Sequence, residues 1–164
     1  MTPFEQQYVD GLPGGLTEGT PWRRAVAWVI DAILIGLLAL ALWAVLFVAG
    51  VLTLGLGFAL MAALPAVPLL YHGLFVAGRR HATPGQAMLD LVVVRADDLG
   101  PPEMGRAVLF TLGLYLTLMV GLWPLLVVFF TDRHRALHDF ASGVVVVRKE
   151  ALTRIAAFAN MGRP

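Results

Sequence analysis

Residues 22–78 read WRRAVAWVIDAILIGLLALALWAVLFVAGVLTLGLGFALMAALPAVPLLYHGLFVAG, and this stretch decides the fold. From Ala32 to Gly78 there are 47 consecutive residues without Asp, Glu, Lys or Arg. The whole chain of 164 residues is 59% hydrophobic and 14% charged, with a mean hydropathy of +0.78. A soluble domain of this size could not bury such a run, so the sequence predicts an integral membrane protein.

The uncharged run is long enough to cross a bilayer twice. As one helix at about 1.5 Å per residue it would extend about 70 Å, whereas a bilayer core is about 30 Å thick. Glycines make residues 50–57 the favoured place for a bend, which predicts helices at about 22–49 and 58–77. Pro65 and Pro68 are expected to kink the second helix and to expose carbonyl groups that a neighbour could use.

A third apolar run, residues 107–131, contains 25 uncharged residues, enough for one crossing. Cations lie before the first predicted helix, after the second and after the third, and three crossings cannot place all of them on the cytoplasmic side. Either a break at Gly121 and Pro124 makes the third run re-entrant or interfacial, with every basic segment cytoplasmic, or the run spans and the C-terminal tail is exported. We therefore expect three hydrophobic helices, the third spanning or re-entrant.

Two polar segments, 79–106 and 132–150, are predicted to lie at the membrane surface. Each contains a β-branched run, at 91–94 and 144–147, and these runs could pair as a two-stranded ribbon supported by surface helices. The expected fold class is thus an all-α membrane protein with interfacial helices and a small β ribbon.

The two ends of the chain differ from the membrane domain predicted at 22–150. Residues 1–21 are polar and lack the pattern of a secretory signal, which predicts a flexible cytoplasmic tail. Residues 151–164 are predicted to be an amphipathic tail, in which 152–159 have the apolar spacing of a short interfacial helix.

Asp31 is the first candidate for function. A charge near the centre of a spanning helix costs roughly 2.5–3.5 kcal/mol on insertion scales, so it is usually turned towards protein. Arg24 precedes it by seven positions, which puts the two on nearly one face but about 10 Å apart. Arg24 could bind a lipid phosphate or a carboxylate of the polar segments. Alternatively, Arg24 only sets the topology and Asp31 only hydrogen-bonds a neighbouring helix.

The histidines give weaker signals. His72 could relay protons with Asp31, or it could hydrogen-bond a neighbouring carbonyl. His134 and His138 lie four apart and could hold zinc only if a third ligand converged, so we predict no metal. The candidates for that third ligand are Asp132, Asp139 and His81.

Several functions are excluded or disfavoured. The absence of cysteine rules out disulfides and thiol nucleophiles. Basic residues interleave with acidic ones, so nucleic acid is not an expected partner. No nucleotide fingerprint predicts a cofactor, and no nucleophile with a base predicts an enzyme. The expected partner is the lipid bilayer, with Arg79 and Arg80 suited to anionic headgroups.

Three ordered segments of the chain resemble the Arg-Asp-Asp (RDD) membrane family. Residues 24–31 (RAVAWVID) resemble its opening signature, with an Arg at the entry of the first helix and an Asp within it. Residues 83–86 (TPGQ) with 91–94 (LVVV) resemble the central segment, and 135–139 (RALHD) with 143–147 (GVVVV) the closing one. By this match the second signature Asp is Asp139, and the matching segments also contain Thr83, Gly85 and His138.

The chain departs from the family pattern at three positions. Gln86, Asp90 and Val144 stand where the family often has Lys, Gly and Thr. A cationic role at position 86 is therefore not carried over to this chain.

The resemblance implies a multi-pass protein of a bacterial inner membrane with a cytoplasmic N-terminus, and sodium/proton antiport has been proposed for some relatives. We expect a small transporter or cation/proton exchange component in which Arg24, Asp31 and Asp139 mark the candidate ion or proton site. Three helices leave little room for a pathway, so this function would need a homo-oligomer or a partner membrane protein. Close packing would use small residues, such as Gly36, Ala39, Gly113 and Gly121.

The alternative is a non-catalytic membrane scaffold or assembly factor. In that case Arg24, Asp31 and Asp139 would form a polar clasp that locks the first helix to the surface segments.

Overall fold

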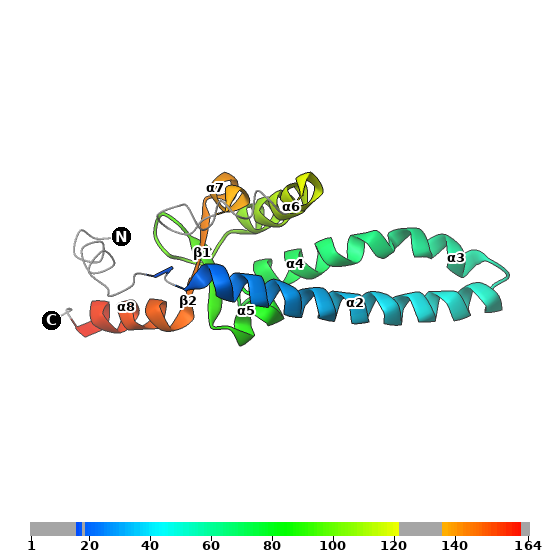
Figure 1. Cartoon of the computed structure of the whole chain (residues 1–164), viewed down its shortest axis with the longest axis horizontal. Coiled ribbons are helices and arrows are strands. Elements are labelled where there is room, and N and C mark those ends of the chain that lie inside the picture. Colours follow the sequence, from blue (N-terminus) through cyan, green and yellow to red (C-terminus); the bar gives the residue numbers. More distant parts are fainter. Residues whose placement is uncertain (1–15, 18, 122–135, 162–164) are drawn as a thin grey trace.

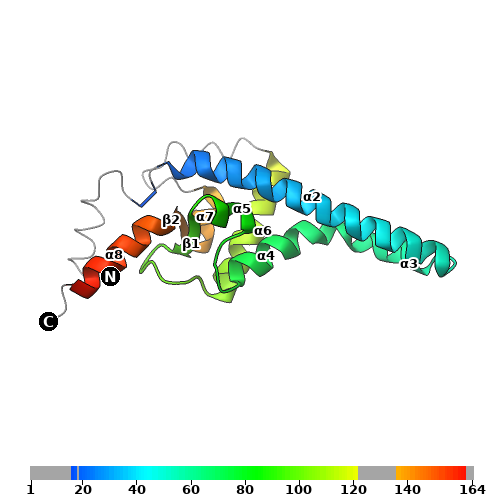
Figure 2. The same ribbon diagram turned by 90° about the horizontal axis from the view of Figure 1, so that it is seen from below.

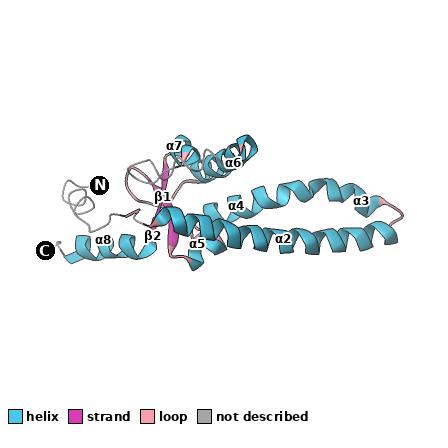
Figure 3. Cartoon of the chain, viewed as in Figure 1, coloured by secondary structure: helices cyan, strands magenta, loops and turns pink. Residues whose placement is uncertain are grey.

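The computed structural model describes residues 16–17, 19–121 and 136–161. The described chain is mostly helical and contains one two-stranded sheet. A long helical hairpin projects from a smaller body that holds the sheet and the short helices (Figures 1 and 2). Figure 3 shows that the strands lie at the base of this hairpin.

The hairpin forms where the uncharged run predicted it. One arm is α2 (Thr20–Leu52), and the other consists of α3 (Leu56–Leu60), η1 (Met61–Ala66) and α4 (Val67–Ala77). Both predicted helices are confirmed, although α2 begins two residues earlier and ends three residues later than expected.

The turn at the hairpin tip is closed by its own polar groups. The Thr53 hydroxyl donates to the Ala49 carbonyl at 2.6 Å and accepts from the Gly57 N–H at 3.1 Å. Gly55 has a φ of 113°, which glycine adopts without strain. A Cβ atom on Gly57 would lie 2.7 Å from the Cα atom of Gly50, so glycine allows the two arms to meet. The predicted bend within residues 50–57 is confirmed.

The second arm is interrupted as the prolines predicted. Pro65 lies inside the 3-10 helix η1, and Pro68 occupies the first turn of α4. Because proline has no N–H to donate, the arm cannot continue as one regular α-helix through these positions.

The two arms are long and apolar enough to cross a membrane, at Thr20–Leu52 and Leu56–Ala77. Their large apolar side chains face outward; Leu37 is 60% exposed and Leu54 at the tip is 99% exposed. Such exposure over most of α2 is the pattern of a lipid-facing helix.

A third membrane-spanning helix is not confirmed. The described part of the third apolar run is in α6 (Met104–Val120), which has 17 residues and is followed by Gly121 at its C-cap. The rest of that prediction, with Pro124, lies outside the described residues. Figure 2 shows α6 crossing the base of the hairpin obliquely.

The predicted ribbon is confirmed: β1 (Leu91–Arg95) pairs antiparallel with β2 (Val144–Arg148). One face packs Val93 and Val146 against Ala27, Val76 and Phe110 of the helices. The other face packs against Leu16 and Ile155. Burial on both faces explains why β2 reads as an unbroken run of valines.

The ends of the chain contribute to this second face. Leu16, within the expected N-terminal tail, is buried against the sheet, and the Leu16 carbonyl accepts from the Arg148 N–H at 3.1 Å. The predicted C-terminal helix is α8 (Lys149–Met161), whose Ile155 is buried on the sheet. α8 extends on the side of the body opposite the hairpin (Figure 1).

Candidate functional site

Asp31 is buried where α2 meets α4 and α5 (Pro84–Met88), with 2% of its surface exposed. Its Oδ1 atom accepts from the Tyr71 hydroxyl at 2.8 Å and from the Gly85 N–H at 2.8 Å. Its Oδ2 atom accepts from the Thr83 hydroxyl at 2.6 Å. Three donors from outside α2 therefore converge on one carboxylate.

The sequence from Thr83 to Gln86 builds its own side of this contact. Thr83 caps α5: its hydroxyl accepts from the Gln86 N–H at 3.2 Å, and the Gln86 side chain accepts from the Thr83 N–H at 3.0 Å. Pro84, at the start of the helix, needs no N–H there. The free N–H of the next residue, Gly85, then points at Asp31. Gln86 thus has a capping role at the position where the family often has Lys.

Glycine is the only residue type that fits at position 85. A Cβ atom on Gly85 would lie 2.9 Å from both Cγ and Oδ1 of Asp31, and it would overlap the Ala27 carbonyl oxygen. The absence of a side chain allows the backbone of α5 to touch α2.

A second polar contact joins α2 to α7 (Leu137–Ser142). The Arg24 guanidinium reaches Asp139 in bidentate geometry, at 2.5 Å to Oδ2 and 3.1 Å to Oδ1. The Ala136 N–H also donates to Oδ2, at 2.9 Å. Of the two partners expected for Arg24, the structure contains the carboxylate.

Asp139 is fully buried, and its charge is balanced locally. Burial alone would raise the pKa of Asp139, but the Arg24 charge and hydrogen bonds hold that pKa below its usual value. The pair is therefore an ionised salt bridge at neutral pH.

The three signature residues form two contacts and not one cluster. Arg24 and Asp139 are paired directly, whereas Asp31 binds Tyr71, Thr83 and Gly85. Because Arg24 and Asp31 are seven residues apart on one face of α2, the contacts lie about 10 Å apart along that helix. We call these two contacts together the polar clasp.

His138 is buried beside the clasp. Its Nε2 atom lies 3.3 Å from Asp139 Oδ1, and its ring meets Phe110 edge-on at 5.3 Å. Gly113 makes room for it, because a Cβ there would lie 2.8 Å from the His138 Cβ. Gly113, expected at an interface between chains, is thus used within this chain. Burial lowers the pKa of His138 to about 4, although Asp139 acts in the opposite direction.

We expect this histidine to make the protein less stable as the pH falls from about 6.5 to about 4. The unfolded imidazole gains a proton near pH 6.5, whereas the folded one gains it only near pH 4. The unfolded state therefore binds more protons in this window, and stability, complete above it, declines by on the order of 3 kcal/mol across it. Thermal unfolding in detergent at several pH values measures this loss.

The control is His138→Gln, which cannot titrate. Its stability is expected to vary less with pH between 6.5 and 4 than that of the unchanged protein. An equally steep decline in both proteins would assign the pH dependence to other groups.

His72 lies next to Tyr71. In the part of the chain that the structure describes, no hydrogen bond joins His72 to Asp31. Its Nδ1 atom lies 3.1 Å from the Pro68 carbonyl oxygen and 2.9 Å from the Tyr115 hydroxyl. The geometry thus fits the expectation that His72 hydrogen-bonds a neighbouring carbonyl, and the ring joins α4 to α6.

Tyr71, which the sequence did not single out, is the residue of α4 that reaches Asp31. A phenol in an apolar helix was the available signal, because a buried hydroxyl needs a partner.

No group of three His, Cys, Asp or Glu side chains that could hold a metal is found in the part of the chain that the structure describes. His134 and Asp132, the weak candidates, lie outside that part. His81 is directed elsewhere, with Nδ1 3.2 Å from the Val76 carbonyl oxygen.

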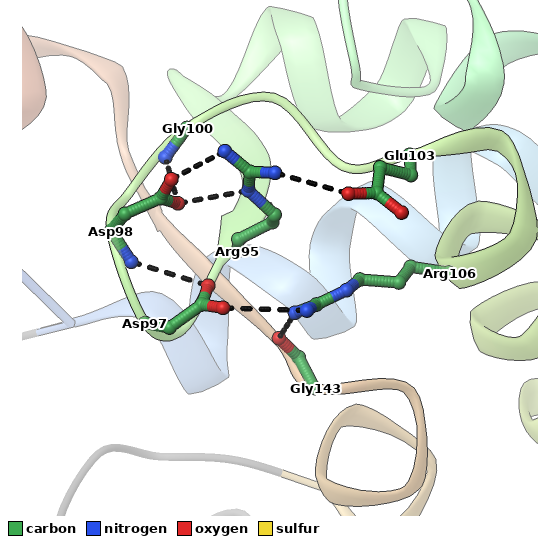
Figure 4. A network of polar contacts seen from close by, with 7 residues as sticks. All are labelled: Arg95, Asp97, Asp98, Gly100, Glu103, Arg106 and Gly143. Atoms are coloured by element: carbon green, nitrogen blue, oxygen red, sulfur yellow. Dashed lines mark hydrogen bonds and ion pairs between the residues drawn. The ribbon is translucent and has the colours of Figure 1, made fainter.

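A separate polar network joins the loop after β1 to α6 and to the residue before β2 (Figure 4). The Arg95 guanidinium bonds Asp98, and the Arg106 guanidinium lies 3.3 Å from Asp97 and 3.3 Å from the Gly143 carbonyl. Most of these side chains are partly or largely exposed, so each pair is weakly stabilising. The interleaved charges seen in the sequence are therefore paired with one another at this surface.

Comparison with models of protein families matches residues 19–143 to the RDD family. No curated protein and no solved structure matches the chain. The matched region covers most of the chain and includes Arg24, Asp31 and Asp139. With its two apolar arms and its polar clasp, the chain belongs to the RDD family.

Proposed function

We propose that this chain is a non-catalytic membrane scaffold, in which the polar clasp fixes the sheet-bearing body to a membrane-crossing hairpin. The observation that carries this proposal is the enclosure of Asp31. Its two oxygens accept three hydrogen bonds from the protein, and only 2% of the residue is exposed. A carboxylate bound in this way resembles a fixed structural group more than an exchanging one.

The Arg24–Asp139 pair supports the same function. It joins residues 115 positions apart, and its bidentate geometry fixes orientation as well as distance. With Asp31 it holds the first part of α2 at two points, so the body cannot rotate freely about the hairpin. A rigid platform at a membrane surface is what a scaffold requires.

The length of α2 supports a position for the clasp near the membrane surface. The 21 residues from Ala32 to Leu52 rise about 31 Å as a helix, close to the bilayer core of about 30 Å. Asp31 would then lie at the near edge of the hydrocarbon, where a carboxylate costs less than at the centre.

Exchange of protons or cations at Asp31 is the second candidate function. The observation in its favour is the Tyr71 hydroxyl on the carboxylate, because a phenol can pass a proton along a hydrogen bond. Such a site would need a homo-oligomer or partner to complete a pathway; within the described part of the chain, Gly36 has open space around it for close packing. A bacterial inner membrane with a cytoplasmic N-terminus is part of either proposal.

Asp31→Asn separates the two functions, because the amide keeps the shape but cannot carry the charge. Proteoliposomes given a sodium or potassium gradient are assayed with a pH-sensitive dye inside. We expect neither the unchanged protein nor the variant to give a cation-driven proton flux above that of empty liposomes. The unfolding temperature of the variant is expected to be lower than that of the unchanged protein, because the amide nitrogen faces hydrogen-bond donors.

The matched control is Asp90→Asn, at a partly exposed carboxylate outside the clasp. It is expected to leave both measurements almost unchanged. Flux in the unchanged protein that Asp31→Asn abolishes, while folding persists and Asp90→Asn retains it, would overturn the scaffold function.

A further inference from the structure

One face of α6 is buried and the other is apolar but exposed. The buried face contains Ala107, Phe110, Thr111, Leu114 and Thr117. On the other face, apolar residues between 43% and 85% exposed recur every three or four positions: Met104, Val108, Leu112, Leu116 and Met119. This exposed stripe runs the length of the helix, so it requires an apolar partner.

The single charged residue of α6 is bound at one end. Arg106 lies in the first turn, where its guanidinium contacts Asp97 and the Gly143 carbonyl on the body (Figure 4). Residues 107–120 carry no charge. The stripe is therefore free of groups that would oppose contact with hydrocarbon.

The helix α6 is joined to the lipid-facing hairpin. α6 packs against α4, and the Tyr115 hydroxyl contacts His72 of that helix. His72 is adjacent to Tyr71, which bonds Asp31, so Tyr115, in the second half of α6, lies near the level of Asp31. By the length of α2, this level is the near edge of the bilayer core, about 30 Å from the hairpin tip.

The direction of α6 differs from that of the two arms. Figure 2 shows that it crosses the base of the hairpin obliquely, whereas a spanning helix would run beside the arms. Its 17 residues extend about 26 Å, and the part of that length that runs across the hairpin adds no depth in the bilayer.

We propose that α6 is an interfacial helix that lies along the near surface of the bilayer, with the stripe from Met104 to Met119 in contact with lipid. The partner of this face is the acyl-chain boundary and not a protein. This inference is independent of the scaffold function, because the clasp does not involve the stripe. It also resolves the charge conflict for the described residues, since Arg79, Arg95, Arg106 and Arg148 can then share one side of the membrane.

Depth measurements test the proposal, and the absence of native cysteine allows single labels. Val108→Cys, Leu112→Cys and Met119→Cys each carry a polarity-sensitive fluorophore in liposomes of phosphatidylethanolamine and phosphatidylglycerol. Nitroxide lipids labelled near the headgroup or near the chain end quench it. We expect strong quenching by the shallow nitroxide at all three positions, at nearly equal depths.

A spanning α6 gives a different pattern. Val108 and Met119 would then differ by about 16 Å in depth, which moves the preferred quencher from shallow to deep along the helix. That gradient would overturn the proposal, and so would the absence of quenching at all three positions. Leu40→Cys on α2, near the centre of the bilayer core, provides the deep reference. Thr153→Cys on α8, which extends away from the hairpin (Figure 1), provides the unquenched one.

Discussion

Asp139→Ala is expected to lower the free energy of unfolding by about 3–5 kcal/mol, the usual effect of breaking a buried ion pair by removing one partner. The substitution leaves the Arg24 guanidinium, 16% exposed, without the carboxylate that it binds twice. It also removes the acceptor of the Ala136 N–H at the start of α7. Denaturant unfolding in detergent, followed by helical circular dichroism, measures the loss.

Asp97→Ala is the matched control, because Asp97 is also paired with an arginine but is 60% exposed. Its loss is expected to stay below about 1 kcal/mol, since water already solvates such a pair. If Asp139→Ala and Asp97→Ala had equal effects, the buried pair would not be a principal contact of the clasp.

The pair is also expected to act as one unit. Arg24→Met combined with Asp139→Leu should cost less than the sum of the two single substitutions, because the double variant leaves neither charge buried alone. Strictly additive losses would show that the two residues stabilise the protein separately.

Local features of the sequence predicted much of this fold for physical reasons. The length of the uncharged run required a bend, glycines marked its position, and two β-branched runs predicted the ribbon. These signals are local, because each depends on neighbouring residues. The same local signals placed Arg24 and Asp31 on one face of a helix.

The partners of those residues could not be predicted in the same way. Arg24 and Asp139 are 115 positions apart, and Asp31 is 40 positions from Tyr71. Only the packing of the helices therefore determines which of these side chains come into contact. The resemblance supplied Asp139 as a signature residue, but it did not divide the three signature residues between two contacts. The role of Gly85 likewise depends on how closely α5 approaches α2.

Hydropathy also could not decide the direction of α6. An apolar segment satisfies the same composition whether it crosses a bilayer or lies along its surface. The difference is set by what its other face packs against, here Val76 of α4 and His138 of α7. Those contacts follow from the fold, and hydropathy does not distinguish the two faces because both are largely apolar in residues 107–120.

Gly85→Ala is expected to lower the free energy of unfolding by about 3 kcal/mol or more, although it adds one methyl group. The added Cβ atom would meet the Asp31 carboxyl group and the Ala27 carbonyl, and a backbone carbonyl within α2 cannot move aside cheaply. α5 must therefore shift away from α2. The shift weakens the hydrogen bonds from Gly85 and Thr83 to a buried carboxylate, which adds a desolvation cost to the steric one.

Gly105→Ala is the control for the chemical change alone. Gly105 lies in α6, and among the described residues no neighbouring atom comes within 4 Å of the place that a methyl group would take. Alanine there is expected to stabilise the helix by up to about 1 kcal/mol. The two substitutions should therefore move the unfolding midpoint in opposite directions. If Gly85→Ala left the midpoint unchanged, the close approach of α5 to α2 would not be needed to hold Asp31, and the clasp would depend on the Arg24–Asp139 pair.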